Sequence, residues 1–197
     1  MVQSHPSIVV LAGPNGAGKT TAAPLLLRDT LALREFVNAD QIAQGLSAFE
    51  PERVAVTAGR LMLARLDELA RQRASFAFET TLASRSFAPW LGARLAAGYI
   101  VHLLFLWLPD PELAVARVAE REARGGHAVP EAVVRRRYAA GLRNFFELYR
   151  PLVSSWRLYD AGGPQGPRLI AAGQQATTAV TDPLRWGRLM RQWSRDG

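Results

Sequence analysis

The stretch VVLAGPNGAGKTT, residues 9–21, indicates how the rest of the chain folds. Its apolar, β-branched start predicts a buried parallel strand, and a glycine-rich turn and then a helix follow it. Residues 13–20 match the pattern G-x-x-x-x-G-K-[ST], in which backbone N–H groups turn toward phosphate oxygens. The stretch therefore predicts a loop that binds the phosphates of a nucleotide.

One basic residue of this loop differs from the others in the chain. Lys19 is the only lysine among the 24 Lys and Arg residues. An ammonium is a compact charge on a thin stem and enters a ring of backbone amides that a broad guanidinium fork does not fit. We therefore expect Lys19 to bind the β and γ phosphates as a catalytic residue, and the Thr20 hydroxyl to bind Mg²⁺. The residues predicted to bind ATP or GTP are Gly13, Pro14, Asn15, Gly16, Ala17, Gly18, Lys19, Thr20 and Thr21.

Composition limits the alternatives without choosing a function. The chain has no cysteine, which excludes disulfides and thiolate metal sites, and with only three histidines a zinc site is not expected. A net charge of +7 would attract nucleic acid, anionic lipid or a phosphorylated small molecule. The start MVQSHPS lacks the features of a signal peptide and no run is long and apolar enough to span a membrane, so we expect a cytoplasmic protein with no membrane partner.

Strand and helix patterns alternate along the chain. Strands are expected within residues 7–13, 34–40, 75–82, 99–109 and 156–163, with a hairpin-like extension at 168–173. Helical patterns lie between them, and a basic, Trp-bearing helix covers 182–197. The alternation predicts an α/β fold, a doubly wound parallel sheet of about five strands flanked by helices. We expect a single domain over 1–197, with a C-terminal extension over about 164–197.

Two acidic residues follow predicted strands at the edge where open parallel sheets bind ligands. Asp40 ends the second strand, and its carboxylate is our candidate base for an acceptor hydroxyl, although it could also cap the following helix. Glu79 ends the third strand, where it could bind substrate hydroxyls or order Mg²⁺ through water. It could equally be an acid paired with one of the many arginines.

Arginines cluster around a Gly-Gly turn later in the chain. Arg117, Arg121 and Arg124 stand at i, i+4 and i+7 and so share one helix face. A second arginine-rich helix, which includes Arg137, follows the turn. The pattern predicts a helical lid over about 117–140 that closes on phosphates, with a solvated helix face as the alternative.

Other residues fit the interior better than the site. His102 lies inside the apolar fourth strand and is expected to be a satisfied core or face residue. The aromatic side chains of Phe145, Phe146, Tyr149 and Trp156 are expected in the core rather than as a platform for stacking bases.

The segments GPNGAGKTT, NAD, FETTLAS, FLWLPDPELAVARVAER and GGHAVPEAVVRRRY together resemble the zeta-toxin family of kinases, over about residues 7–160. The resemblance implies a P-loop fold similar to nucleoside monophosphate kinases with an Arg-rich lid. It also implies transfer of phosphate from a nucleoside triphosphate to the sugar 3′-hydroxyl of UDP-N-acetylglucosamine, and an antitoxin protein as a possible partner.

The resemblance also implies roles for individual residues. Asp40 matches the catalytic base, and Glu79 and Thr81 match groups that contact the sugar nucleotide. Arg117 and Arg121 match lid arginines, the first on the nucleotide and the second, as a catalytic residue, on the transferring phosphate. The remaining substrate-binding candidates in the lid are Arg124, His127 and Arg137, with His127 standing where family members place an arginine.

These observations predict a Mg²⁺-dependent kinase that uses ATP or GTP and a small phosphorylated acceptor, with UDP-N-acetylglucosamine as the leading candidate. A kinase for another acceptor, such as a nucleotide, an antibiotic or an RNA end, is an alternative. The basic stretch RWGRLMRQWSR, residues 185–195, keeps a nucleic acid open. A second alternative is a nucleotide-dependent switch or binding protein without phosphate transfer.

Overall fold

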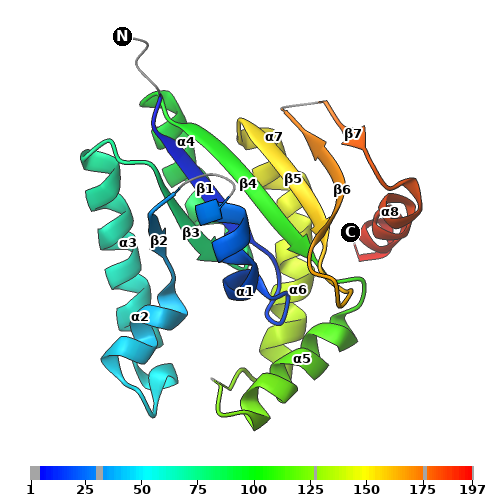
Figure 1. The fold of residues 1–197 in the computed structure, drawn as a ribbon, viewed down its shortest axis with the longest axis horizontal. Coiled ribbons are helices and arrows are strands. Elements are labelled where there is room, and N and C mark those ends of the chain that lie inside the picture. Colours follow the sequence, from blue (N-terminus) through cyan, green and yellow to red (C-terminus); the bar gives the residue numbers. More distant parts are fainter. Residues whose placement is uncertain (1–4, 30–32, 127, 175–176, 197) are drawn as a thin grey trace.

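Figure 1 shows the computed structural model of the chain, which describes residues 5–29, 33–126, 128–174 and 177–196. In chain order the strands and helices are β1 (Ser7–Ala12), α1 (Lys19–Ala23), β2 (Glu35–Val37), α2 (Ala39–Leu46), α3 (Ala55–Arg71), β3 (Phe76–Thr80), α4 (Phe87–Ala96), β4 (Ile100–Trp107), α5 (Pro111–Ala123), α6 (Glu131–Asn144), α7 (Arg150–Leu152), β5 (Ser155–Asp160), β6 (Arg168–Gly173), β7 (Ala179–Val180) and α8 (Pro183–Asp196). A short 3₁₀ helix (Pro51–Val54) precedes α3, and π-helical turns follow α1 (Pro24–Asp29) and α6 (Phe145–Tyr149).

Within the described residues the strands form one sheet in the order β2-β3-β1-β4-β5-β6-β7. The first five of these neighbours pair in parallel, as the alternating sequence pattern predicts. β6 and β7 add to the edge antiparallel. The expectation of about five strands is therefore wrong for the whole sheet, which has seven. The parallel part is the doubly wound core, and the hairpin-like extension supplies the additional edge.

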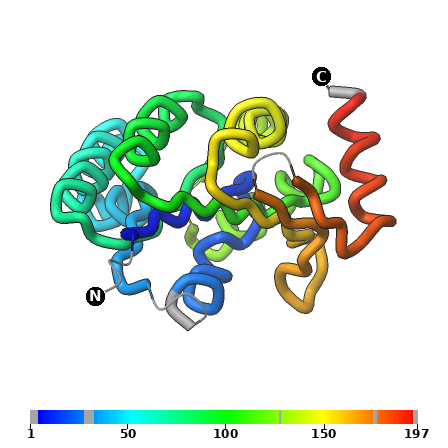
Figure 2. The backbone as a smooth tube through the Cα atoms, turned by 90° about the horizontal axis from the view of Figure 1, so that it is seen from above, coloured from blue at the N-terminus to red at the C-terminus, as the bar shows by residue number. Residues whose placement is uncertain are grey.

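The sheet separates two hydrophobic layers. Along β1, Ile8 and Val10 face one layer while Val9 and Leu11 face the other, because successive side chains of a strand alternate. Residues of α3 and α4 pack in the first layer, residues of α1 and α5 pack in the second, and α6 contributes residues to both. Figure 2 shows α3, α4 and α6 on one side of the sheet and α1 on the other. The carboxyl ends of the parallel strands stay uncovered by these layers, and the loops there carry the candidate site.

The aromatic residues that follow α6 are core residues, as predicted. Phe145, Tyr149 and Trp156 are fully buried, and Phe146 is nearly so. The ring of Phe145 contacts those of Phe146 and Trp156 edge to face. His102 is half-buried and bonds through Nδ1 to the Ser155 hydroxyl on β5, at 2.7 Å, which accounts for it as a face residue of the sheet.

The basic C-terminal helix is a packed part of the fold. Leu189 of α8 is fully buried, and Trp186, Met190 and Trp193 pack against the first hydrophobic layer. Arg185 donates to Asp160 at 2.7 Å, so one of the arginines of this helix serves the fold. No helix in the described part of the chain is long and apolar enough to cross a membrane.

The segment predicted as a lid consists of α5, a turn and α6. Arg135 of α6 donates to Glu112 at the start of α5 and also to Glu131. The hydroxyl of Tyr138 donates to the carbonyl of Leu108 at 2.6 Å. These contacts fix the base of the helical pair. A closing motion of this segment stays a prediction.

Helix α6 also lies against the loop that follows β3. A Cβ added to Gly141 would lie 2.4 Å from the Thr81 carbonyl oxygen, so the helix backbone approaches this loop closely. Asn144 donates to the Leu82 carbonyl at 2.7 Å and Tyr149 to that of Ser84 at 2.6 Å. Contacts at three positions of the segment from α6 to α7 thus hold the loop that carries the predicted substrate residue Thr81.

We expect Gly141→Ala to lower the free energy of unfolding by about 1–3 kcal/mol, because the added methyl forces the helix away from the loop. Gly92→Ala is the matched control, since a Cβ at this helical glycine meets nothing within 4 Å. The control should leave stability unchanged or raise it by up to about 1 kcal/mol. Urea unfolding of both variants measures the difference, and equal stability would contradict the close approach.

Candidate functional site

The turn between β1 and α1 is shaped by two glycines. Gly13 has a φ of 141°, and a Cβ there would lie 2.3 Å from the Leu106 carbonyl oxygen on β4. Gly16 has a φ of 78°, and a Cβ there would lie 2.9 Å from the Ala114 carbonyl oxygen of α5. Only glycine fits both positions, so the loop is held tightly between β4 and α5. This is the strand, turn and helix arrangement that the sequence motif predicts.

Lys19 lies inside this turn. Its side chain is 6% exposed, and its Nζ donates to the Pro14 carbonyl at 3.0 Å and lies 3.5 Å from Glu79 Oε1. Burial lowers the pKa of the Lys19 ammonium, because a charge removed from water is disfavoured. The carboxylates of Glu79 and Asp40 oppose this shift and the guanidinium of Arg121 adds to it. Charged groups from three other segments therefore lie within electrostatic reach of this ammonium.

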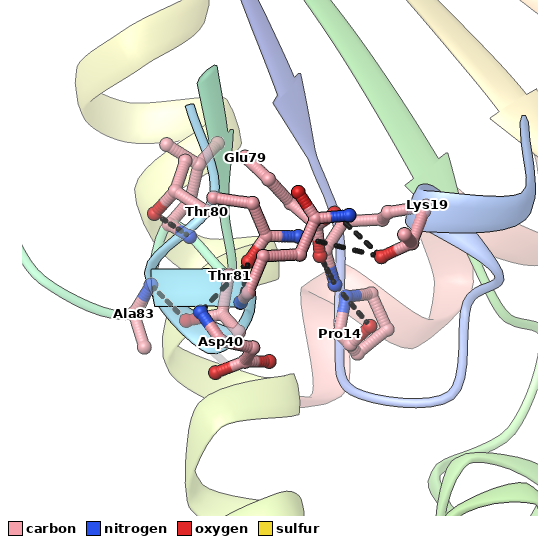
Figure 3. A network of polar contacts seen from close by, with 11 residues as sticks. Pro14, Lys19, Asp40, Glu79, Thr80, Thr81 and Ala83 are labelled. Carbon is pink, nitrogen blue, oxygen red and sulfur yellow. Dashed lines mark hydrogen bonds and ion pairs between the residues drawn. The ribbon is translucent and has the colours of Figure 1, made fainter. Parts of the chain in front are cut away.

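Glu79 is the centre of a hydrogen-bond network at the mouth of the turn (Figure 3). Its Oε2 accepts from the Thr20 hydroxyl at 2.9 Å and from the Asn38 amide at 2.8 Å. The Asn38 amide also lies 3.4 Å from the Thr20 oxygen, as a second, longer hydrogen bond. The predicted phosphate side, Lys19 and Thr20, and the predicted substrate residue Glu79 are thus brought together in one network.

Asp40 lies at the start of α2, beside this network. Its carboxylate is exposed and points away from the hydrogen bonds drawn in Figure 3. The cap of α2 is Asn38, whose Oδ1 accepts from the N–H groups of Asp40 and Gln41 at 2.8 and 3.4 Å. The alternative that Asp40 caps its helix is therefore wrong, because the cap stands two residues earlier. The side chain of Asp40 is available to a ligand at this edge of the sheet.

Asn38 is the functional residue that sequence reasoning missed. It is the first letter of the NAD segment, and its side chain is 4% exposed. The available signal was its type and place, since asparagine is a preferred helix cap directly before a helical pattern. The sequence does not predict the contact between Asn38 and Glu79, because this contact depends on β2 lying beside β3.

Thr81 follows β3 and lies two residues after Glu79. Its hydroxyl oxygen accepts from the Ala83 N–H at 3.4 Å, and Thr80 accepts from the Leu82 N–H at 3.1 Å. Leu82 has a positive φ of 55°, which turns the chain sharply here. The half-buried Thr81 hydroxyl keeps its hydrogen for donation, which suits the predicted contact with a substrate.

Two of the three arginines that share a helix face in the sequence have different kinds of partner in the structure. Arg117 is half-buried and donates to the carbonyls of Ala161 at 2.8 Å, Gly162 at 2.9 Å and Gly16 at 3.4 Å. Its guanidinium therefore joins the phosphate loop to the loop after β5. Arg124 is exposed and pairs with Glu120 at 2.6 Å, which is the contact that the solvated-face alternative predicts for it.

The arginines of α5 nevertheless line a common hollow. An open depression of about 440 Å³ is lined by Arg117, Glu120, Arg121, Arg124, Gly125 and Gly126. Arg137 is half-buried in α6 and is not among these lining residues. His127 lies outside the described residues. A basic hollow of this size beside the phosphate loop suits a polyphosphate.

The oxygen atoms of Thr20 and Glu79 at the mouth of the loop could serve as ligands of a magnesium ion. A hydroxyl and a carboxylate, the oxygen ligands that Mg²⁺ prefers, stand 2.9 Å apart at Thr20 and Glu79. No group of three or more His, Asp and Glu side chains that could hold a metal occurs among the described residues. A cation here would therefore rely on nucleotide phosphates for further ligands, as is usual for Mg²⁺.

The parallel sheet, the glycine turn around Lys19 and the acids at the neighbouring strand ends define a P-loop phosphotransferase. The model of the zeta toxin family matches residues 1–153. The chain belongs to the zeta toxin family.

One protein of known sequence and several solved structures are similar to this chain. An uncharacterized protein of Haemophilus influenzae is 27% identical over 130 residues, which are 66% of this chain and 91% of that protein. The PezAT toxin-antitoxin structure of Streptococcus pneumoniae has a TM-score of 0.66 at 14% identity, covering 100% of this chain and 87% of that chain.

Structures of the AvrRxo1-ORF1:AvrRxo1-ORF2 complex are also similar. With sulphate ions the TM-score is 0.77 at 17% identity, and with ATP it is 0.75 at 18% identity. Each alignment covers 95% of this chain and 64% of the other, so this chain spans less than two thirds of the length of that protein. At these identities the likeness is one of fold.

Proposed function

We propose that this protein is a Mg²⁺-dependent kinase that transfers the γ-phosphate of ATP or GTP to a hydroxyl of a small phosphorylated acceptor. UDP-N-acetylglucosamine is the leading candidate, from the family to which the chain belongs. The observation that carries the proposal is the network of Lys19, Thr20, Asn38 and Glu79, with the exposed carboxylate of Asp40 beside it. It joins groups that bind phosphate to a group able to accept a proton.

On the nucleotide side, the backbone N–H groups of the loop surround the phosphates and Lys19 exchanges its Glu79 and Pro14 partners for phosphate oxygens. Thr20 and Glu79 would hold Mg²⁺, which supplies charge neutralisation between the β and γ phosphates when bound. Arg121, on the basic hollow of α5, adds positive charge where the transferring group passes.

On the acceptor side, Asp40 accepts the proton of the attacking hydroxyl. The hydroxyl oxygen forms a bond to the γ-phosphorus as the bond from this phosphorus to the β–γ bridging oxygen breaks, and ADP or GDP leaves. Thr81 donates to the acceptor from the loop held by α6. Arg124, His127 and Arg137 are proposed to bind acceptor phosphates when the lid closes.

The proposed function also includes a protein partner and a cellular location. The PezAT structure is that of a toxin-antitoxin system, and we propose that an antitoxin restrains this chain as well. We also propose that it acts in the cytoplasm, where nucleoside triphosphates are made.

Purified protein with Mg-ATP is tested by ADP release and by acceptor mass against UDP-sugars, nucleotides and short RNAs. A gain of one phosphate on UDP-N-acetylglucosamine is the expected result. The same gain on another acceptor would keep the kinase and replace the substrate. Tight ATP binding without transfer to any member of the panel would instead favour a nucleotide-dependent switch or binding protein.

A further inference from the structure

The side chain of Asn38 uses every polar atom it has. It stands where β2 gives way to α2 and is 4% exposed. Its Oδ1 accepts from two N–H groups of α2, those of Asp40 and Gln41. Its Nδ2 donates to Glu79 Oε2 at 2.8 Å and to the Thr20 hydroxyl oxygen at 3.4 Å. One amide therefore bonds to the helix that carries the proposed base and to the groups that face the nucleotide.

The contacts of Asn38 also orient the carboxylate of Glu79. Oε2 receives two donors, the Asn38 amide and the Thr20 hydroxyl, while Oε1 is the oxygen that lies 3.5 Å from Lys19 Nζ. If the Asn38 donor were removed, Oε2 would lose the shorter of these hydrogen bonds and the carboxylate could rotate. A side chain without an N–H group cannot make this contact, even where it still caps the helix.

We propose that Asn38 is a positioning residue. It holds helix α2, which carries the proposed base Asp40, and the Glu79 carboxylate at fixed positions relative to each other. Both parts of this inference rest on the proposed function, but only the part that concerns phosphate transfer needs an acceptor, and the part that concerns Glu79 needs only Mg²⁺ and ATP. Asp40 lies at the start of α2 and Glu79 near the end of β3, so a group that bonds to both segments fixes their relative placement. A displacement of about 1 Å between reacting groups lowers a rate about 100-fold.

Two substitutions separate this role from helix capping. Asp and Ser are both good caps, so Asn38→Asp and Asn38→Ser should preserve α2. Neither replaces the amide donor to Glu79, because an ionised Asp side chain only accepts hydrogen bonds and the Ser hydroxyl is one atom shorter than the Asn amide. We expect ATP affinity without Mg²⁺ to stay within about threefold of wild type, while the gain in ATP affinity on adding Mg²⁺ and the transfer rate both fall about 10- to 100-fold.

A double-mutant cycle with Glu79→Gln keeps the proposal testable if a single variant is unstable. If Asn38 acts through Glu79, Asn38→Ser should add little further loss of Mg²⁺-dependent ATP affinity to Glu79→Gln. Additive losses, or Asn38 variants that keep wild-type Mg²⁺ dependence of ATP affinity, would overturn the proposal and leave Asn38 as a helix cap. If wild type transfers phosphate to no acceptor, the proposed function fails, while the Mg²⁺-dependent ATP affinity still decides the role of Asn38.

Discussion

Lys19→Arg is expected to lose nucleotide binding although it keeps the positive charge. The ammonium of Lys19 is 6% exposed and donates to the Pro14 carbonyl at 3.0 Å from within the turn. The turn cannot widen, because the Gly13 backbone already passes so close to Leu106 of β4 that no Cβ fits. A guanidinium is broader than this space and would leave the loop or distort it.

The expected loss of ATP affinity is about 10- to 100-fold, because a hydrogen bond to a charged group contributes about 1.5–3 kcal/mol. Phosphate transfer is expected to fall about 10³-fold, since the same charge also acts on the transition state. Titration calorimetry with ATP and a coupled assay of ADP release measure the two effects.

Two further variants frame the result for Lys19→Arg. Lys19→Ala should show losses of similar size, because both variants lack an ammonium inside the turn. Arg188→Lys, an exchange of the same two residue types at an exposed position of α8, is the control and should bind ATP as wild type does. If Lys19→Arg kept wild-type affinity, a cation of either shape would suffice and the fit of the turn to an ammonium would be wrong.

The parts of the fold that sequence predicts best depend on local patterns. The alternation of strand and helix patterns predicts the five parallel strands, and β1 and β4 are the clearest because they are largely buried and read as apolar runs. β6 and β7 are less apparent because β6 is only partly buried and β7 is a two-residue, exposed edge strand. β6 joins the sheet by pairing with β5, and β7 by pairing with β6, which are tertiary contacts rather than local preferences.

The candidate site divides in the same way. The phosphate loop is contiguous in the chain, so its motif identifies every residue of it. The pairing of Glu79 with Asn38, and the use of Arg117 to bond carbonyls of two loops, join residues far apart in the sequence. Residue type indicates that an arginine is charged, and spacing indicates which side chains lie on the same helix face. They do not indicate whether its partner is a phosphate or a backbone carbonyl.

Asp40→Asn is expected to keep ATP binding and to lose phosphate transfer by about 10²- to 10⁴-fold, the usual contribution of a general base. The exchange preserves the size of the side chain and removes its ability to accept a proton. The α2 helix should persist, because its cap is Asn38 and not Asp40. Titration with Mg-ATP and the acceptor assay with mass detection separate binding from transfer.

Glu52→Gln is the matched control for this variant, because Glu52 is also an exposed acid in the first turn of a helix, the short one before α3. It should transfer phosphate at the wild-type rate. Transfer unchanged in Asp40→Asn would show that another group accepts the proton, since no neutral amide can do so. Loss of ATP binding in Asp40→Asn would instead assign Asp40 to the nucleotide side, where its charge already acts on Lys19. Loss of transfer with Mg-ATP binding retained is the outcome expected of a group that acts on the acceptor hydroxyl.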